Sequence, residues 1–322
     1  MRQNTPKLIK VGLIGVGKMG ENHLRILSML KNISVEFIYD IDKEKAAYLA
    51  EKYAVSATVD IEQSLSKVDA VAICSPTHMH YKHLMLVSQF VSHIFVEKPL
   101  TDSLATSEKV ISLAKERCLT IQVGFIERFN PAIQALNRIL KNGINVLNID
   151  FERTNRLSDR ITDIDVIYDL MIHDIDLALY LNGDIANITA NGIIRNNMIA
   201  FATANFIHKN GTLSRILASR ITEKKFRHIR VTCENLFIDC ELLRKEIIIN
   251  RQSKTESGVG QHISIANLQE TVVVPPQEAL LDELTTFFHK SVDANVQVPD
   301  EIDGLNAIRV CDQIKDIIWS NH

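Results

Sequence analysis

The sequence lacks the features that mark secreted, disulfide-stabilised or membrane-spanning proteins. Its 322 residues include five cysteines, none in a CxxC pair, and a chain of this length can bury a sizeable core without disulfide bonds. No apolar run is long enough to span a membrane, and the polar first seven residues are unlike a signal peptide. We therefore expect a reduced, cytoplasmic protein with no membrane segment.

The sequence also lacks an excess of either charge. Lys and Arg number 36 and Asp and Glu number 39, which gives a formal net charge of -3, so there is no basic footprint for nucleic acid. With 46% hydrophobic and 23% charged residues, the composition is that of a globular protein. The length indicates two domains.

What the sequence does contain is a glycine-rich turn between an expected strand at 10–14 and an expected helix at 21–31. Gly15 there permits a tight turn, Gly17 lets a pyrophosphate approach the backbone, and Gly20 allows close helix packing. Asp40 lies 20 residues after Gly20, where a carboxylate binds the ribose hydroxyls of a dinucleotide. The alternative to a dinucleotide-binding loop is a structural glycine turn. Because an acid repels the 2′-phosphate of NADP, we expect NAD rather than NADP. The loop residues expected to contact NAD are Gly15, Val16, Gly17, Lys18, Met19 and Gly20.

Strands and helices then alternate as far as residue 124. Strands are expected at 10–14, 35–39, 70–74, 94–96 and 120–123, and helices at 21–31, 43–52, 81–91 and 103–117. Strands separated by helices predict a parallel, doubly wound Rossmann sheet, which we assign to an NAD-binding domain at 1–124. Ligands bind at the carboxyl ends of the strands in such a sheet.

Two of those strand ends carry polar groups, which we expect to contact the cofactor: Ser75, Pro76, Thr77 and His80 at one, Glu97 and Lys98 at the other. Lys98 can also polarise a substrate hydroxyl or carbonyl; the alternative is a surface ion pair. The spacing of His78, His80 and His83 invites a metal site, but no cluster of Cys or carboxylates accompanies them. We therefore expect no metal.

Residues 125–322 show consecutive strands with little helix between them. Strands are expected at 145–153, 188–194, 199–206, 212–219, 228–232, 236–240 and 246–249, with helices at 132–140, 278–291 and 303–320 and a Ser- and Gly-rich loop at 254–262. This order predicts a second, α+β domain at 125–322 on an open, largely antiparallel sheet. The donors Arg128, Asn130, Arg153 and Arg156 are candidates for holding substrate phosphate or amide groups. Asn130 could instead cap the helix that Pro131 begins.

A further helix is expected at 165–180. At about 100° per residue, its polar groups form one stripe, made of Asp165, Asp169, His173, Asp176 and Tyr180. Asp169 lies one turn before His173, so its carboxylate can accept the imidazole N–H, fix the tautomer and raise the basicity of the ring. This is the geometry of an oriented general base; the alternative is a structural histidine.

The motifs GVGKMG, ICSPTHMH and VEKPL and the Asp169/His173 pair together resemble the glucose-fructose oxidoreductase, inositol dehydrogenase and MocA (Gfo/Idh/MocA) family. The resemblance runs nearly end to end and implies that Lys98, Asp169 and His173 line the active site. It also implies that the open sheet face is buried against a second subunit, in a homodimer or homotetramer.

Within the family, GFIERFNPA and DLMIHDIDLAL are similar to the sugar-nucleotide branch, the UDP-N-acetylglucosamine 3-dehydrogenases. This resemblance implies oxidation of a sugar 3-hydroxyl, with an aminotransferase then supplying an amino sugar for envelope glycolipid (lipid A). The alternatives are the uronic acid form of the nucleotide, a free sugar or inositol as substrate, and a non-catalytic dinucleotide sensor. Binding alone needs no acid/base pair, so His173 with Asp169 argues against the sensor.

Overall fold

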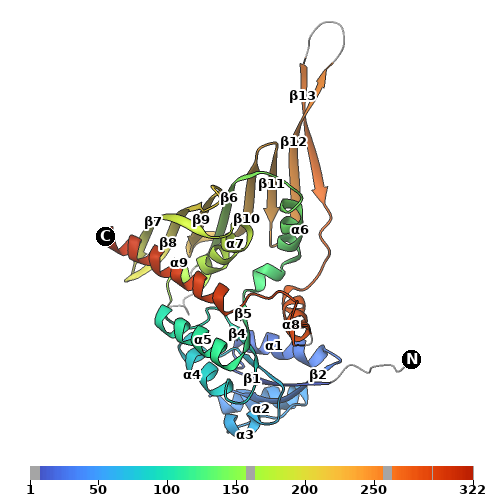
Figure 1. The fold of residues 1–322 in the computed structure, drawn as a ribbon, viewed down its shortest axis with the longest axis vertical. Coiled ribbons are helices and arrows are strands. Elements are labelled where there is room, and N and C mark those ends of the chain that lie inside the picture. The colour runs from blue at the N-terminus through green and yellow to red at the C-terminus, as the bar shows by residue number, and fades with distance from the viewer. Residues whose placement is uncertain (1–7, 157–163, 257–262, 292, 322) are drawn as a thin grey trace, which may run out of the picture. The chain divides into compact units, whose positions relative to one another are not determined.

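The computed structural model describes the whole chain except residues 1–7, 157–163, 257–262, 292 and 322. For residues 253–266 it describes no side chains. The described chain forms two compact units (Figure 1). The first comprises Met1–Ile126 and Leu280–Ile308, and the second comprises Glu127–Ala279 and Arg309–His322.

The first unit is built on a five-stranded parallel sheet with the order β2-β1-β3-β4-β5. Its strands are β1 (Ile9–Ile14), β2 (Ile33–Tyr39), β3 (Ala70–Ile73), β4 (His93–Glu97) and β5 (Thr120–Gly124). Its helices are α1 (Lys18–Met29), α2 (Lys43–Tyr53), α3 (Ile61–Leu65), α4 (Thr77–Val87), α5 (Leu104–Arg117) and α8 (Ala279–Lys290). The Rossmann prediction is confirmed, with α3 as an addition. Helix α4 begins before the predicted residue 81, directly after Pro76, whose fixed φ suits the entry to a helix.

Helix α8 packs into the core of the first unit, although we expected it in the second domain. Leu280, Leu284, Phe287 and Phe288 are buried in the same apolar cluster as β1 and α1. The ring of Phe287 lies 5.8 Å from that of Phe95 in β4, edge to face, a favourable aromatic arrangement. The apolar face of α8 was visible in the sequence, but the core that it completes was not.

The second unit is built on an eight-stranded sheet with the order β13-β12-β11-β10-β6-β9-β8-β7. Its strands are β6 (Val146–Arg156), β7 (Ile185–Arg195), β8 (Met198–His208), β9 (Leu213–Ser219), β10 (Ile221–Cys233), β11 (Leu236–Glu241), β12 (Glu246–Glu256) and β13 (Ile263–Val272). The pairing is antiparallel except between β6 and β9, so the predicted largely antiparallel sheet is confirmed. Strand β12 takes in the start of the predicted loop at 254–262, the rest of which lies outside the described residues, and β13 was not predicted.

One face of this sheet carries helices. Helix α6 (Pro131–Leu140) contacts β11 and β12, and α7 (Ile172–Asn182) contacts β6 and β9 (Figure 1). The strand register puts Ile193, Ile207, Leu213 and Phe237 together on the opposite face, where their side chains are 37–49% exposed. Arg215 and Asp150 pair on that face at 3.0 Å. This open face is therefore mixed, with apolar and charged groups.

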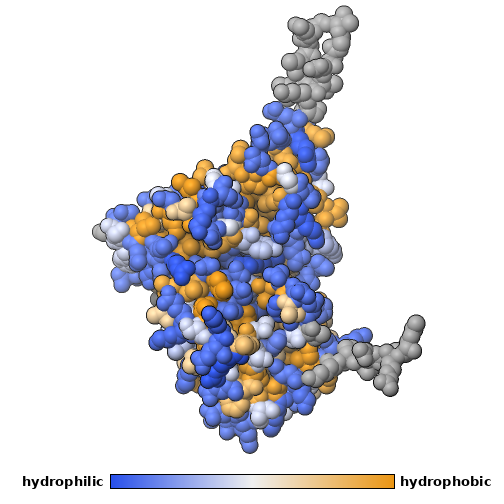
Figure 2. Space-filling view, viewed as in Figure 1, coloured by the Kyte–Doolittle hydropathy of each residue, from blue (hydrophilic) through white to orange (hydrophobic). Residues whose placement is uncertain are grey.

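Among the residues that the structure describes, no helix meets the length and hydropathy that crossing a membrane requires. Figure 2 shows hydrophilic residues interspersed with smaller apolar areas over the viewed face.

We predict that Phe287→Ala lowers the free energy of unfolding by about 3–5 kcal/mol, because it leaves a cavity in the core of the first unit. Urea unfolding followed by circular dichroism measures this change. Phe90→Ala is the matched control, since Phe90 is 44% exposed and its loss should change the unfolding free energy by less than about 0.5 kcal/mol. Equal effects of the two variants would contradict the assignment of α8 to this core.

Candidate active site

The glycine-rich turn after β1 has the geometry of a dinucleotide loop. Gly15 has a φ of +93°, which disfavours any side chain. A Cβ on Gly20 would lie 1.9 Å from the carbonyl oxygen of Gly15, whereas a Cβ on Gly17 would meet no atom within 4 Å. The backbone at Gly17 is therefore open to a ligand, while Gly20 is needed for the fold of the loop itself.

The N-terminus of α1, directly after this turn, fits a pyrophosphate. No side chain caps α1 at Gly17, whereas Asp42, Asp60, Ser103 and Asn130 each cap the helix that they precede. The first N–H groups of α1 therefore keep the capacity to bind an anion. Beside them, the backbone N–H of Val16 donates to Asp40 Oδ2 at 2.7 Å. Asp40, expected to bind a ribose, thus also fixes the loop.

His80, which we expected to contact the cofactor, is buried. Its ring is 1% exposed, with Nδ1 2.8 Å from the Pro99 carbonyl oxygen and Nε2 2.8 Å from the Ser75 carbonyl oxygen. Burial lowers the pKa of His80, so the ring is neutral at pH 7 and donates to one of the two carbonyls. His80 therefore ties together the two loops that carry the expected cofactor contacts, and the prediction that it contacts the cofactor directly does not fit its burial.

Glu97, at the end of β4, contacts a buried histidine to which the sequence analysis assigned no role. His23 Nε2 lies 2.8 Å from Glu97 Oε1. Burial raises the pKa of the Glu97 carboxyl, but His23 and Lys98 outweigh it, and that pKa is lowered. The backbone N–H of Lys98 donates to Glu97 Oε2 at 3.3 Å, and the Lys98–Pro99 peptide is cis. Lys98 thus sits on a turn that its neighbours fix.

Ligand atoms of His23, Cys74 and Glu97 lie within 4.8 Å of one another, close enough for a metal site. Burial, with smaller contributions from Glu97 and Glu283, raises the pKa of the Cys74 thiol well above its usual value. Metal ligation requires the thiolate. The raised pKa and the His23–Glu97 bond favour a polar support for the turn over a cation site.

In the second unit, the segment that carries Asp169 and His173 is helical but not uniformly α-helical. It begins as a π-helical turn, η2 (Ile167–Met171), and continues as α7. The predicted stripe is therefore wrong in part, because the wider turn changes the phase of residues before Ile172. Asp176 is 1% exposed rather than part of a wet face, and Asp174, which the stripe excluded, carries a buried charge.

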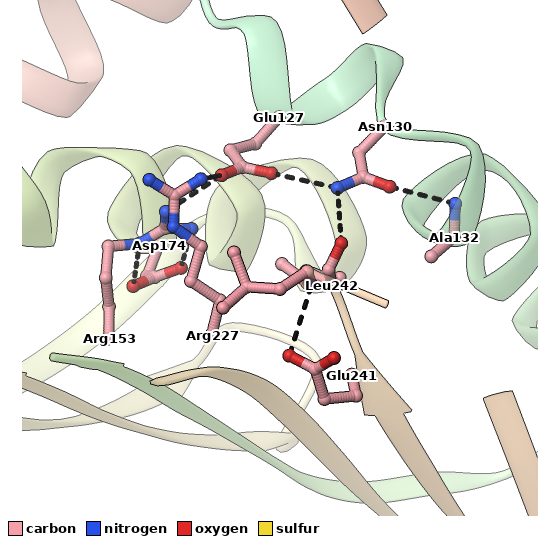
Figure 3. Close-up of polar contacts among 9 residues, drawn as sticks. Glu127, Asn130, Ala132, Arg153, Asp174, Arg227, Glu241 and Leu242 are labelled. Atoms are coloured by element: carbon pink, nitrogen blue, oxygen red, sulfur yellow. Dashed lines mark hydrogen bonds and ion pairs between the residues drawn. The ribbon is translucent and has the colours of Figure 1, made fainter. Parts of the chain in front are cut away.

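Figure 3 shows the buried charge cluster that holds Asp174. Arg153 donates from Nε and Nη2 to both carboxylate oxygens of Asp174 at 2.8 Å, and from Nη1 to Glu127 Oε1 at 2.8 Å. Arg227 donates to the same oxygen of Glu127 at 3.0 Å. Burial raises the pKa of Glu127, but the two arginines outweigh it and lower that pKa. Sequence reasoning missed Glu127, Asp174 and Arg227, which lie on separate segments with no shared motif.

The cluster corrects two of the expected substrate contacts. Arg153 is 2% exposed and its guanidinium donates to the two carboxylates, so it does not fit a role in holding a diphosphate. Asn130 caps α6 through the N–H of Ala132 at 3.1 Å, as the structural alternative had it, and donates to Glu127 Oε2 at 3.2 Å. Both residues build the unit rather than face a ligand.

The other two expected contacts differ from each other. Arg128 donates from Nε at 2.9 Å and from Nη2 at 2.6 Å to the carboxylate of Asp176, and its guanidinium lies 4.7 Å from the ring centroid of Tyr180. Arg156 is 77% exposed and pairs with Glu223 at 3.3 Å. Arg156 is therefore the member of the four donors that keeps a solvent-facing guanidinium.

Asp169 has a partner that sequence reasoning also missed. Arg220, at the junction of β9 and β10, places Nη2 2.9 Å from Asp169 Oδ2. The Asp169 side chain is 29% exposed, whereas the Arg220 side chain is 4% exposed. The carboxylate of Asp169 is thus held from the interior, while part of it remains accessible.

Comparison with known proteins places these features in a family. The family models described as "Oxidoreductase family, NAD-binding Rossmann fold" and "GFO/IDH/MocA C-terminal domain" match residues 9–125 and 147–238. The chain belongs to the Gfo/Idh/MocA oxidoreductase family. As the sequence predicts, it is an enzyme, an NAD-dependent oxidoreductase.

Relatives in the Gfo/Idh/MocA family cover the chain to different extents. The UDP-N-acetylglucosamine 3-dehydrogenase of Acidithiobacillus ferrooxidans is 28% identical over 95% of this chain and 96% of the relative, and a solved structure of it has a TM-score of 0.87 over 97% and 98% of the two chains. The myo-inositol 2-dehydrogenase of Thermotoga maritima is 27% identical over 55% of each chain. A levoglucosan dehydrogenase in complex with NADH, at 18% identity and a TM-score of 0.82 over 97% of each chain, shares the fold.

We predict that Gly17→Ala and Gly20→Ala weaken NAD binding for different reasons. Gly20→Ala forces a clash within the loop, so it should lower the melting temperature and weaken NAD binding at least tenfold. Gly17→Ala should leave the melting temperature within about 2 °C of wild type and still weaken NAD binding, because the pyrophosphate needs that space. Calorimetric titration with NAD and thermal melts separate the two effects. Full NAD affinity in Gly17→Ala would rule out the loop as the pyrophosphate site.

We also predict that stability falls on the acid side because of His83. Burial, followed by the charges of His80 and Lys82, lowers the pKa of His83 to about 4, and its Nδ1 lies 2.9 Å from Ser75 Oγ. The unfolded state, with a pKa of about 6.5, binds a proton first as pH falls from 6.5 to 4, so stability is lost across that window.

The matched variant is His83→Gln, which removes the titrating group. Melting temperatures between pH 7.5 and 4 should fall less steeply in His83→Gln than in the wild type. Because other buried histidines contribute in the same direction, the difference between the two curves is the quantity to compare, and parallel curves would refute the assignment.

Proposed function

We propose that this enzyme oxidises the 3-hydroxyl of UDP-N-acetylglucosamine to the 3-keto sugar nucleotide with NAD. The observation that carries the proposal is similarity over nearly the whole length to a relative of that activity, together with Lys98, Asp169 and His173 at the positions that the family resemblance assigns to catalysis. The sensor alternative has no need of these three groups. Together, a lysine and an Asp–His pair suit the oxidation of a CH–OH group, which must lose a proton and a hydride.

In the proposed reaction, neutral His173 accepts the proton of the 3-hydroxyl, with Asp169 orienting its ring and stabilising the imidazolium. Lys98 donates to the same oxygen and stabilises the negative charge that develops on it. When bound, NAD supplies the acceptor for the hydride from carbon 3. The reaction thus needs one base and one cation from the protein, and the chain offers both.

Substrate binding is proposed to use Arg156, since its guanidinium is largely exposed and suits a diphosphate. We also propose a homodimer or homotetramer through the open sheet face, whose four exposed apolar side chains would be buried there. The use of the keto product by an aminotransferase, in a cytoplasmic route to lipid A, stays a prediction from the resemblance.

We predict that the purified protein reduces NAD when given UDP-N-acetylglucosamine, read as NADH absorbance, with a keto sugar nucleotide detected by mass spectrometry. His173→Ala and Lys98→Met should each lower kcat by about 10²–10⁴-fold, the usual contribution of acid/base groups. His173→Ala should leave NAD affinity within about threefold. Tyr180→Phe is a control on the same helix, because Tyr180 is 38% exposed; it should keep wild-type turnover.

The substrate panel decides among the alternatives. Turnover of the uronic acid nucleotide, a free sugar or inositol in place of UDP-N-acetylglucosamine would replace the proposed substrate. NAD binding without turnover of any of them would support the sensor. A His173→Ala enzyme with full activity would remove the assigned base.

A further inference from the structure

Three acidic residues in the segment around His173 are each held by a different buried arginine. Asp169 pairs with Arg220, Asp174 with Arg153 and Asp176 with Arg128. The side chains of Arg220, Arg153 and Arg128 are 4%, 2% and 10% exposed, respectively. The arginines come from separate places in the second unit: the β9–β10 junction, β6, and the 3-10 helix η1 (Ile126–Phe129). The segment is therefore fixed from three directions.

The three pairs differ in what they leave accessible. The side chains of Asp174 and Asp176 are 3% and 1% exposed, but that of Asp169 is 29% exposed. The first two pairs are wholly internal and act on the position of the backbone of α7. The third pair reaches a carboxylate that still faces outward, one turn before His173.

Arg220 itself makes two further hydrogen bonds, one from its side chain and one from its backbone. Its Nη1 donates to the carbonyl oxygen of Ile164, immediately before the helical segment, and its backbone N–H donates to the Ala200 carbonyl in β8 at 2.9 Å. One guanidinium thus joins the chain before the segment to the carboxylate inside it. The rigid plane of a guanidinium fixes these two contacts relative to each other better than a flexible ammonium does.

Other charged and titratable groups on and around the segment have contacts of their own. From α9 (Glu301–Ser320), Asp312 accepts the hydroxyl of Tyr168, and Lys315 lies 3.8 Å from Asp165. Arg153 and Arg128 are engaged by Asp174 and Asp176, as described above. Among the residues that the structure describes, Arg220 is therefore a cation whose removal directly changes the charge next to Asp169.

We propose that Arg220 is a positioning residue for the Asp169–His173 pair: it fixes the Asp169 carboxylate and offsets part of its charge. The inference rests on the proposed function for the role of His173. Without Arg220, the full charge of Asp169 acts on the His173 ring and stabilises the imidazolium. A base that holds its proton to higher pH is then less available near neutrality.

The test compares Arg220→Met, which removes the charge, with Arg220→Lys, which keeps the charge and loses the fork. In Arg220→Met the acid limb of the kcat–pH profile should move up by about one pH unit, in the range that one nearby charge produces. In Arg220→Lys the limb should stay within a few tenths of a unit of wild type while kcat falls several-fold. A loss of kcat in Arg220→Met that is equal at every pH would mean a merely structural role and overturn the proposal.

The matched control is Arg227→Met, which also removes an arginine of the second unit, but one that contacts Glu127 rather than an acid of this segment. Its acid limb should coincide with wild type. Asp169→Asn closes the cycle: adding Arg220→Met to it should produce no further shift, because the two residues act through one contact. An additional shift would place the effect of Arg220 elsewhere.

A readout without substrate keeps this inference separate from the proposed function. Titration of the His173 ring protons by NMR in the full-length protein, assigned by their absence in His173→Gln, should give a higher pKa in Arg220→Met than in wild type. If that shift occurs but UDP-N-acetylglucosamine is not oxidised, the proposed substrate fails and the role of Arg220 stands. If oxidation occurs without the shift, the role of Arg220 fails. Should Arg220→Met not fold, Arg220→Gln, which also removes the charge, takes its place in both measurements.

Discussion

The contact between Arg153 and the carboxylates of Asp174 and Glu127 is the interaction on which the second unit depends. A guanidinium that is 2% exposed loses its hydration, and removing one partner from such a buried pair costs about 3–5 kcal/mol. Well-packed apolar residues could supply equal stability, so the cluster is better understood as a constraint on geometry. It joins β6, η1 and α7 in one arrangement, and α7 carries His173.

The first unit reaches its arrangement by local chemistry. Gly15, Gly17 and Gly20 follow β1 at a spacing that few structures other than a dinucleotide loop require, and Asp40 follows at the expected distance. These features are contiguous in the sequence, so the sheet, the loop and the cofactor could be predicted. Residues 280–308 could not be assigned to this unit, because their apolar face shows that α8 packs but not against which core.

The candidate site in the second unit was only partly predictable, for a physical reason. An arginine in a sequence offers the same donors whether it meets a substrate or a buried carboxylate, and Arg153, Arg128 and Arg220 find their partners through folding alone. The π-helical turn η2 likewise leaves no signal in the hydrophobic period, and the burial of Asp176 depends on Arg128, which lies on a separate segment. The roles of Asp169 and His173 stay predictions, which rest on their spacing within one helical turn and on the family resemblance.

The central claim is that hydride leaves carbon 3 of the sugar nucleotide, and its most direct test is to follow that hydride. UDP-N-acetylglucosamine carrying deuterium at carbon 3 is incubated with the enzyme and NAD, and the reduced cofactor is analysed by mass spectrometry. The account predicts reduced cofactor heavier by one deuterium, and slower turnover than with unlabelled substrate where hydride transfer limits the rate. Unlabelled NADH formed together with a keto sugar nucleotide would contradict it, because the hydride would then come from another carbon.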